Sequence, residues 1–479
     1  MNAKHKLALI VAGALLAVSA GAAATAAEPA RRGPFDARAR EIFEKVISIP
    51  TELGRRKVPE MAAYLAGEFR AAGFPAEDVT IVPFKLPEDE TASLIVRYRG
   101  DGSGGKPILL LAHMDVVTAK PSDWVRDPYK LIEEDGWFYG RGTYDVKHGI
   151  TELTTTFLRL KAEKFVPKRD LIIYFSGDEE TAMATTVAVV KDHRELIDAE
   201  YALNADGGGG VLDDETGKPL YFGFQTAEKT YVDFKLTTRN PGGHSSLPRP
   251  DNAIYDLSEA LVKLRKFSFP VMWNDTTIAG FRESAKTTPG ELGQAMAKFA
   301  ANPKDEAAAS ALSANPAYVG QLRTTCVATM LEGGHAQNAL PQSAVANVNC
   351  RIFPGVKIED VRTALAGVVG EGVEVKVDGE PMSSNASPLR KDLVAAVTRV
   401  VHKFYPGVII APQQASGATD GLVFRAAGIP TYGIDPTFIR DKDAMAHGLN
   451  ERLPVASFYN GLEMWYLLIK DLAGPSKKR

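Results

Sequence analysis

The chain has 479 residues, of which 45% are hydrophobic and 24% are charged, and its formal net charge is −3. These values are typical of globular proteins and exclude a disordered or fibrous chain. The slightly acidic balance argues against a protein that binds nucleic acid or anionic lipid. Because the length exceeds what a single core usually fills, we expect two domains.

The first 26 residues have the layout of a secretory signal peptide. Lys4 and Lys6 precede an apolar run at residues 7–18, and residues 24–26 are small, as a cleavage site requires. We expect cleavage there, which removes two lysines and leaves a net charge of −5. The mature protein would be exported, periplasmic or secreted, and free of the membrane. The alternative is an uncleaved membrane anchor, for which the apolar run is short.

The next part of the chain alternates between patterns typical of helices and of strands. Helices are expected at residues 36–47, 59–72 and 148–164, and strands at residues 79–84, 92–98, 108–112 and 171–175. The last two strands are apolar throughout, as strands buried on both faces are. The alternation predicts an α/β protein in which a mixed sheet lies between layers of helices.

The pattern changes near residue 230. Within residues 229–380 we expect strands at 231–238, 324–331, 344–353 and 373–377, and helices at 252–267 and 358–369. This β-α-β-β-α-β order predicts a small, ferredoxin-like α+β domain inserted into a larger one, with a further insertion at about 268–322. Expected helices at 389–404 and 455–472 return the chain to the larger domain, which therefore comprises residues 27–228 and 381–479.

The chain has two cysteines, Cys326 and Cys350, which are too few to form a structural zinc site by themselves. Each lies in one of the expected strands of the inserted domain. If these strands pair as an antiparallel hairpin, a cross-strand disulfide is possible, and export would permit it. A pair of buried free thiols is the alternative.

Histidine and acidic residues follow the two buried strands, where open α/β sheets form their sites. His113-Met114-Asp115 follows the strand at 108–112, and a nearby carboxylate can orient a metal-binding histidine. Asp178, Glu179 and Glu180 follow the strand at 171–175, and such neighbouring carboxylates repel one another unless cations offset their charge. Taken singly, each group is also compatible with a strand cap or a solvated acidic turn.

Three further segments carry the same residue types. Asp145 ends a glycine-containing segment, Asp206 follows an apolar run at 201–203, and His447 lies near the end of the chain. Asp145 is alternatively the N-cap of the helix that follows, and the other two are alternatively surface-loop residues. Together, however, two histidines and several carboxylates match the ligands of a two-metal hydrolase.

With these five segments in this order and spacing, residues 40–472 resemble the dinuclear-zinc carboxypeptidase and aminoacylase family. The family includes glutamate carboxypeptidase, carboxypeptidase S, carnosinase and succinyl-diaminopimelate desuccinylase. The resemblance implies a phosphorylase/hydrolase-like zinc-peptidase sandwich as the catalytic domain, with the inserted ferredoxin-like domain as its lid. It also implies two divalent metal ions, for which mixed nitrogen and oxygen ligands favour zinc, with cobalt or manganese as alternatives.

The resemblance implies which residues hold the metal ions. Asp145 would bridge both ions, His113 and Asp206 would complete one site, and Glu180 and His447 would complete the other.

It also implies residues that act beside the metals. Glu179 would be the general base, and Asp115 would orient His113. The peptide bond between Asp145 and Val146 would be cis.

Further residues resemble the family's substrate contacts. His244 would stabilise the oxyanion of the reaction, and Arg351 would bind the substrate carboxylate, which a guanidinium binds well. Asn338, Gly417 and Thr419 would contact the substrate as well. Each is alternatively a turn or surface residue.

We therefore expect a hydrolase that cleaves an amide bond next to a carboxylate. The substrate would be a short peptide, as for a carboxypeptidase or dipeptidase, or an N-acyl amino acid. A non-catalytic metal- or peptide-binding protein is the alternative from another class, and the intact Glu179 argues against it. Relatives that dimerise through the lid make a homodimer possible, and the long insertion at 268–322 leaves a monomer equally open.

Overall fold

Continuously apolar runs form the centre of a ten-stranded sheet in the computed structural model, which describes residues 33–87 and 89–474. β3 (Ile108–His113) and β6 (Leu171–Ser176) are buried along their whole length and pair in parallel. β7 (Tyr201–Asn204) pairs in parallel with the other side of β3. The expected signal peptide at residues 1–26 lies outside the described residues.

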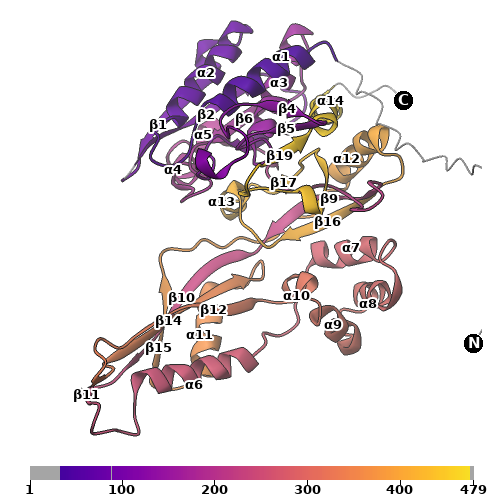
Figure 1. Cartoon of the computed structure of the whole chain (residues 1–479). Coiled ribbons are helices and arrows are strands. Elements are labelled where there is room, and N and C mark those ends of the chain that lie inside the picture. Colours follow the sequence, from indigo (N-terminus) through magenta and orange to yellow (C-terminus); the bar gives the residue numbers. More distant parts are fainter. Residues whose placement is uncertain (1–32, 88, 475–479) are drawn as a thin grey trace, which may run out of the picture. The chain divides into compact units, whose positions relative to one another are not determined.

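The sheet continues on both sides of these three strands (Figure 1). Antiparallel β2 (Glu90–Tyr98) and β1 (Val79–Lys85) extend it beyond β6. Beyond β7 follow β17 (Thr431–Gly433), β9 (Pro219–Glu228), β8 (Gly209–Leu212) and β18 (Phe438–Arg440), while β16 (Ile409–Ala415) also pairs with β9. Parallel and antiparallel pairs both occur, so the expected mixed sheet is confirmed.

Helices cover both faces of this sheet. Side chains alternate between the faces along each strand, so the apolar central strands have side chains to bury on both faces. The face with Leu110 and Ile173 shares its core with α1 (Asp36–Ser48), α2 (Val58–Ala71), α3 (Lys147–Ala162), α12 (Lys391–Phe404) and α14 (Val455–Ala473). The face with Leu109 and Ile172 is covered by α4 (Ala184–Asp192), α5 (Arg194–Ile197) and α13 (Asp420–Ala426).

A small sheet joins two distant parts of the chain beside the main sheet. β5 (Trp137–Tyr139) pairs with β4 (Ile132–Glu134) and with β19 (Arg452–Pro454). This pairing places the loop after β5 next to the loop before β19. Three short 3-10 helices lie in loops elsewhere: η1 (Ala76–Asp78), η2 (Pro121–Asp123) and η3 (Asp441–Asp443).

The residues between β9 and α12 form a second, four-stranded sheet. Its order is β12-β14-β10-β15, all antiparallel, and α6 (Ala253–Lys266) and α11 (Ile358–Val369) share its core. The strands are β10 (Thr230–Arg239), β12 (Thr325–Gly333), β14 (Ser343–Ile352) and β15 (Val373–Asp378). This is the β-α-β-β-α-β arrangement that the sequence predicted. A two-residue ladder of β11 (Gly243–His244) and β13 (Ala339–Leu340) lies beside it.

The segment 268–322 is helical, which the sequence analysis did not anticipate. It forms α7 (Asp275–Ser284), α8 (Gly290–Ala301), α9 (Glu306–Ser313) and α10 (Pro316–Leu322) around a small apolar core. α7 lies against the main sheet, where Thr276 shares a 2.5 Å hydrogen bond with Thr226. The described residues 33–87 and 89–474 all belong to one unit of contacts, so the domain boundaries stay a prediction.

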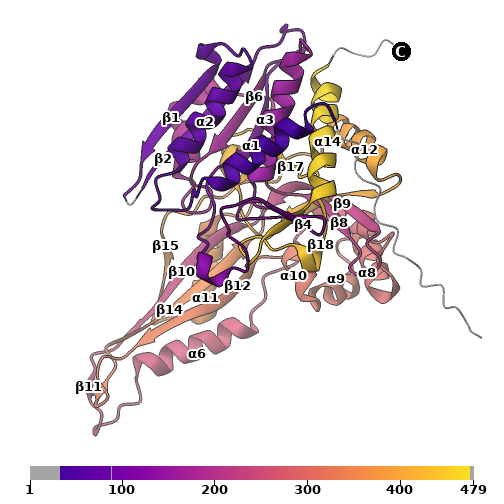
Figure 2. The same ribbon diagram turned by 45° about the horizontal axis from the view of Figure 1, so that its top comes forward.

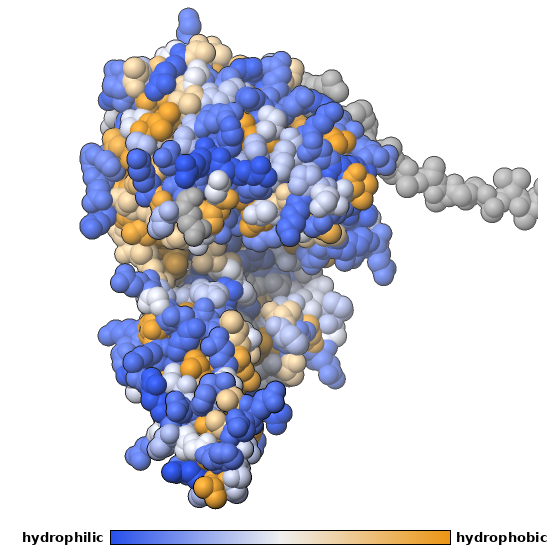
Figure 3. Space-filling view, turned by 60° about the vertical axis from the view of Figure 1, so that its left-hand side comes forward, coloured by the Kyte–Doolittle hydropathy of each residue, from blue (hydrophilic) through white to orange (hydrophobic). Residues whose placement is uncertain are grey.

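The surface is that of an ordinary globular protein. On the face that Figure 3 shows, hydrophobic residues are scattered among more numerous hydrophilic ones. Among the helices of residues 33–87 and 89–474, none has the length and apolarity that crossing a membrane requires.

The two cysteines form the cross-strand disulfide that the sequence suggested. Cys326 of β12 and Cys350 of β14 are directly opposite each other in the ladder and are covalently joined. The bond connects the edge strand β12 to the interior of the four-stranded sheet.

We predict that replacing both cysteines by alanine lowers the free energy of unfolding by about 3 kcal/mol, because the bond closes a loop of intermediate length. The sequence separation of the two cysteines is 24 residues. Urea denaturation of the double variant and of the wild type measures the difference. A thiol assay on the unreduced, denatured wild type provides the check, since two reactive thiols would contradict the disulfide.

Candidate metal centre

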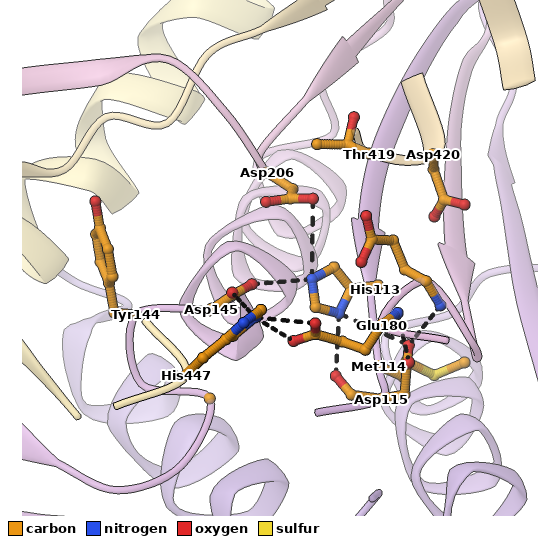
Figure 4. Close-up of polar contacts among 12 residues, drawn as sticks. His113, Met114, Asp115, Tyr144, Asp145, Glu180, Asp206, Thr419, Asp420 and His447 are labelled. Atoms are coloured by element: carbon orange, nitrogen blue, oxygen red, sulfur yellow. Dashed lines mark hydrogen bonds and ion pairs between the residues drawn. The ribbon is translucent and has the colours of Figure 1, made fainter. Parts of the chain in front are cut away.

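Three parallel strands end at the same edge of the main sheet and carry the candidate site (Figure 4). His113 is the last residue of β3, the acidic residues 178–180 follow β6, and Asp206 follows β7. Gly177 permits the turn after β6, because a Cβ atom there would lie 2.3 Å from Oγ1 of Thr91. The fold thus brings these three segments together.

Asp145 lies between two histidines from opposite parts of the sequence. Its Oδ1 is 3.0 Å from Nε2 of His113, and its Oδ2 is 3.0 Å from Nε2 of His447. Val146, whose side chain makes no capping hydrogen bond, is the N-cap of α3, so the N-cap alternative for Asp145 is wrong. The bond between Asp145 and Val146 is cis, as the resemblance implied. One carboxylate therefore presents one oxygen to each histidine.

Each histidine has a further carboxylate beside it. Nε2 of His113 is 3.9 Å from Oδ2 of Asp206, and Nε2 of His447 is 2.9 Å from Oε2 of Glu180. Ligand atoms within 4.8 Å of one another form two overlapping groups: His113, Asp145 and Glu180, and His113, Glu179 and Asp206. The structure thus brings together all five predicted ligands. The predicted general base, Glu179, lies in the same cluster.

This set of donor atoms fits a pair of divalent cations. Imidazole nitrogens and carboxylate oxygens are the ligands that zinc and similar ions take in hydrolases. His113 is 1% exposed, and the carboxylates of Asp145 and Asp206 are about one fifth exposed. His447 is more exposed than these groups, with 54% of its side chain accessible. Several acids gathered around a buried imidazole are costly unless cations offset their charge.

Burial and neighbouring groups shift the pKa values of several residues in this cluster. Burial raises the pKa of Glu179 and of Asp206 well above their usual range, although the charge of His113 opposes the shift. The hydrogen bonds to Asp145 and Glu180 raise the pKa of His447 to about 10. All three shifts favour the protonated forms of these groups.

Asp115 lies against His113 and connects two of the loops, and its Oδ1 is 3.7 Å from Nδ1 of His113. Its backbone carbonyl, not its carboxylate, accepts the 3.0 Å hydrogen bond from Nδ1 of His113. The carboxylate accepts the backbone N–H groups of Glu179 and Glu180 at 3.1 and 3.0 Å. Asp115 thus fixes the loop after β3 to the loop after β6.

Some of the predicted substrate contacts lie together at the boundary of the two sheets. Nη1 of Arg351 donates to the carbonyl of Ser416 at 2.9 Å, next to Gly417. The Thr419 hydroxyl donates to Glu228 at 2.7 Å. The contact of Glu228 could not be predicted from neighbouring residues, because its partner in that bond lies 191 positions away.

His244 and Asn338 lie elsewhere. Nδ1 of His244 accepts a hydrogen bond from the backbone N–H of Ser246, and the carbonyl of Asn338 accepts the backbone N–H of Ser245. β11, which carries His244, lies at the end of the four-stranded sheet away from the main sheet in both Figure 1 and Figure 2. Within one chain, the structure therefore does not bring this histidine to the metal cluster.

Comparison with known families identifies the same region. The model described as "Peptidase family M20/M25/M40" matches residues 109–471, which is more than half of the chain. All five predicted metal ligands lie within the matched residues.

Similar proteins cover most of the chain. The human "N-fatty-acyl-amino acid synthase/hydrolase PM20D1" is 26% identical over 90% of this chain and 87% of its own length. The "Probable carboxypeptidase S-like 2" of Dictyostelium discoideum is 26% identical over 79% of this chain and 74% of its own length. The solved structure of an M20 family metallo-carboxypeptidase from Sulfolobus solfataricus shares the fold, with a TM-score of 0.66, 18% identity and coverage of 91% and 99% of the two chains.

We predict that zinc uptake by the metal-free protein at pH 8 releases protons. With a pKa of about 10 the ring of His447 is protonated at that pH, whereas an imidazole that binds a metal ion must be neutral. Titration calorimetry in two buffers of different ionisation enthalpy counts the released protons. The variant H447A should release about one proton fewer. Equal release by both proteins would contradict the assignment of His447.

Proposed function

The chain belongs to peptidase family M20/M25/M40, and we propose that it is an exported enzyme that uses two metal ions to hydrolyse an amide bond next to a carboxylate. The position of Asp145 carries this proposal, because its two oxygens face two different histidines at equal distances. A carboxylate that bridges two cations requires this arrangement. Zinc is the metal that the ligand types favour.

Glu179 is the general base of the proposed reaction. Two bound cations would lower the pKa of a water molecule and offset charge on the substrate oxygen. Glu179 lies beside His113 and Asp206, and burial raises the pKa of its carboxyl well above the usual range. It removes the proton from the attacking water and then delivers it to the leaving nitrogen.

The carboxylate of the substrate would bind at the boundary of the two sheets. Arg351 is held there by the carbonyl of Ser416, and a guanidinium can bind a carboxylate through two parallel hydrogen bonds. Gly417 and Thr419 follow in the same loop. A carboxypeptidase or dipeptidase acting on short peptides would use this contact to recognise the C-terminus.

An N-acyl-amino-acid deacylase is the second candidate, and one observation favours it. Val125, Met445 and Leu449 are 81%, 37% and 56% exposed, and the last two flank His447 in the sequence. Asn450 accepts the backbone N–H of Val125 at 3.1 Å, which brings the two loops together. Such an apolar rim would suit an acyl chain, and the human relative is described as an N-fatty-acyl-amino acid synthase/hydrolase.

Export is part of the proposal because two features support it. Residues 1–26 have the layout of a signal peptide. The disulfide between Cys326 and Cys350 is of a kind that persists in oxidising compartments and is rare in the cytosol.

We also propose that the working enzyme is a homodimer, in which His244 acts in the site of the partner subunit. His244 is exposed and lies away from the cluster of its own chain. The edge strand β12 exposes Val327, Met330 and Leu331, which are more than half accessible, and an edge strand can pair with a second copy.

We predict that Glu179→Gln keeps both metal ions but lowers kcat by about 100-fold or more, because glutamine cannot carry the proton. Metal analysis and assays on dipeptides and N-acyl amino acids, with and without chelator, measure the two effects. The ratio of the rates on the two substrate classes decides between the two candidate activities. Wild-type enzyme that binds metal but hydrolyses neither class would favour a binding protein.

We predict that His244→Ala is inactive by itself and is rescued by the equally inactive Glu179→Gln. In a mixed dimer the first chain supplies Glu179 and the second supplies His244, so one site of two is complete. Mixing equal amounts should restore up to about a quarter of the wild-type rate. No recovery from a mixture in which differently tagged chains co-purify as mixed dimers would contradict the shared site.

A further inference from the structure

A buried carboxylate outside the metal cluster holds the loop that carries Asp145. Glu451 is fully buried and accepts three backbone N–H groups of that loop: those of Gly142, Tyr144 and Asp145, at 3.0, 2.7 and 2.9 Å. A carboxylate that accepts several backbone donors fixes their positions relative to one another, because each charge-assisted bond is strong and directional. The backbone of Asp145 is thus tied to a residue near the end of the chain.

Arg141 connects the same carboxylate to the loop that carries His447. Its Nη1 donates to Glu451 at 2.6 Å, and its Nη2 donates to the carbonyls of His447 and Gly448 at 3.3 and 3.2 Å. Arg141 is 3% exposed. One guanidinium therefore spans the two loops, whose flanking strands β5 and β19 also pair with each other.

The backbone conformation of His447 is an independent sign that its loop must be held in place. Its φ is +61°, in the left-handed region that residues with a side chain seldom adopt. A conformation of this kind persists only when the surroundings fix it. The hydrogen bond from Arg141 to the carbonyl of His447 supplies such a constraint.

We propose that Arg141 and Glu451 are positioning residues that set Asp145 and His447 in place before the metal ions bind. The inference rests on the ligand roles in the proposed function. It predicts that the pair controls the site of Glu180 and His447 more than the site of His113 and Asp206. His113 is held independently by the carbonyl of Asp115, and the backbone of Asp206 is held by Asn204.

Arg141→Lys is the sharper of two test variants. Lysine keeps the charge, but a single ammonium group cannot bond the carboxylate and both carbonyls in the geometry of the guanidinium fork. In Glu451→Gln the carboxylate becomes an amide. The NH2 group that replaces one oxygen cannot accept a hydrogen bond from Gly142 or Arg141. Both changes leave every proposed metal ligand in the chain.

Arg97 offers a matched control. Its Nη1 donates to the carboxylate of Asp170 at 2.8 Å, and its Nη2 donates to the carbonyls of Glu195 and Leu196 at 3.3 and 3.4 Å. Asp170 also accepts the backbone N–H of Gly100. Because Asp170 directly precedes β6, this pair lies at the opposite end of that strand from the metal cluster. The control variants are therefore Arg97→Lys and Asp170→Asn.

Zinc titration of the metal-free proteins by calorimetry measures the effect without an activity assay. We expect two binding events in the wild type and in both controls. In Arg141→Lys and Glu451→Gln, one event should weaken by about 10- to 100-fold, the size of effect that supporting residues of metal ligands have. The other event should weaken less, because its site shares Asp145 but not His447 with the first. Two unchanged events, or equal weakening of both, would overturn the proposal. A wild type that binds no zinc would instead refute the proposed function.

Hydrogen exchange on the metal-free wild type tests the proposal without any variant. If the pair presets the loop, the peptide that contains the N–H groups of Gly142, Tyr144 and Asp145 is protected before metal is added. Fast exchange that slows only after zinc is added would overturn the proposal. Where a variant folds, the same peptide should lose protection in Glu451→Gln and keep it in Asp170→Asn.

Discussion

Mutual repulsion among buried carboxylates is the constraint on which this structure depends. Asp145, Glu179, Glu180 and Asp206 converge with two imidazoles where three parallel strands end. In the metal-free protein, hydrogen bonds between acids and protonated histidines offset part of this charge. Divalent cations would offset it better, because they carry two charges each and bind the same oxygen atoms. The acids therefore make chemical sense as metal ligands.

The fold holds the ligands close together from two separate parts of the structure. The central strands β3, β6 and β7 are buried and deliver three segments to one edge. The other two ligands, Asp145 and His447, come from loops beside the small sheet of β5 and β19, where Arg141 and Glu451 join them. Rigid strands thus position part of the site, and a buried ion pair positions the remainder.

Local sequence patterns were sufficient to predict those parts of the structure that depend on nearby residues. The apolar strands, most helices and the β-α-β-β-α-β order were predictable, since each depends on periodicity or on neighbouring residues. The roles of the five ligand segments came from the family resemblance, because each segment taken singly is also compatible with a cap or a surface loop. The helices of residues 268–322 were missed, because the stretch is rich in alanine and polar residues and has only a small core. Contacts such as Arg141 with Glu451 were also missed, because they join residues 310 positions apart.

Anomalous diffraction from crystals of the zinc-loaded protein, recorded on both sides of the zinc absorption edge, will show whether Asp145 bridges two cations. We expect two peaks per chain, one between Asp145, His113 and Asp206 and the other between Asp145, Glu180 and His447. A single peak, or peaks that lie away from Asp145, would contradict it.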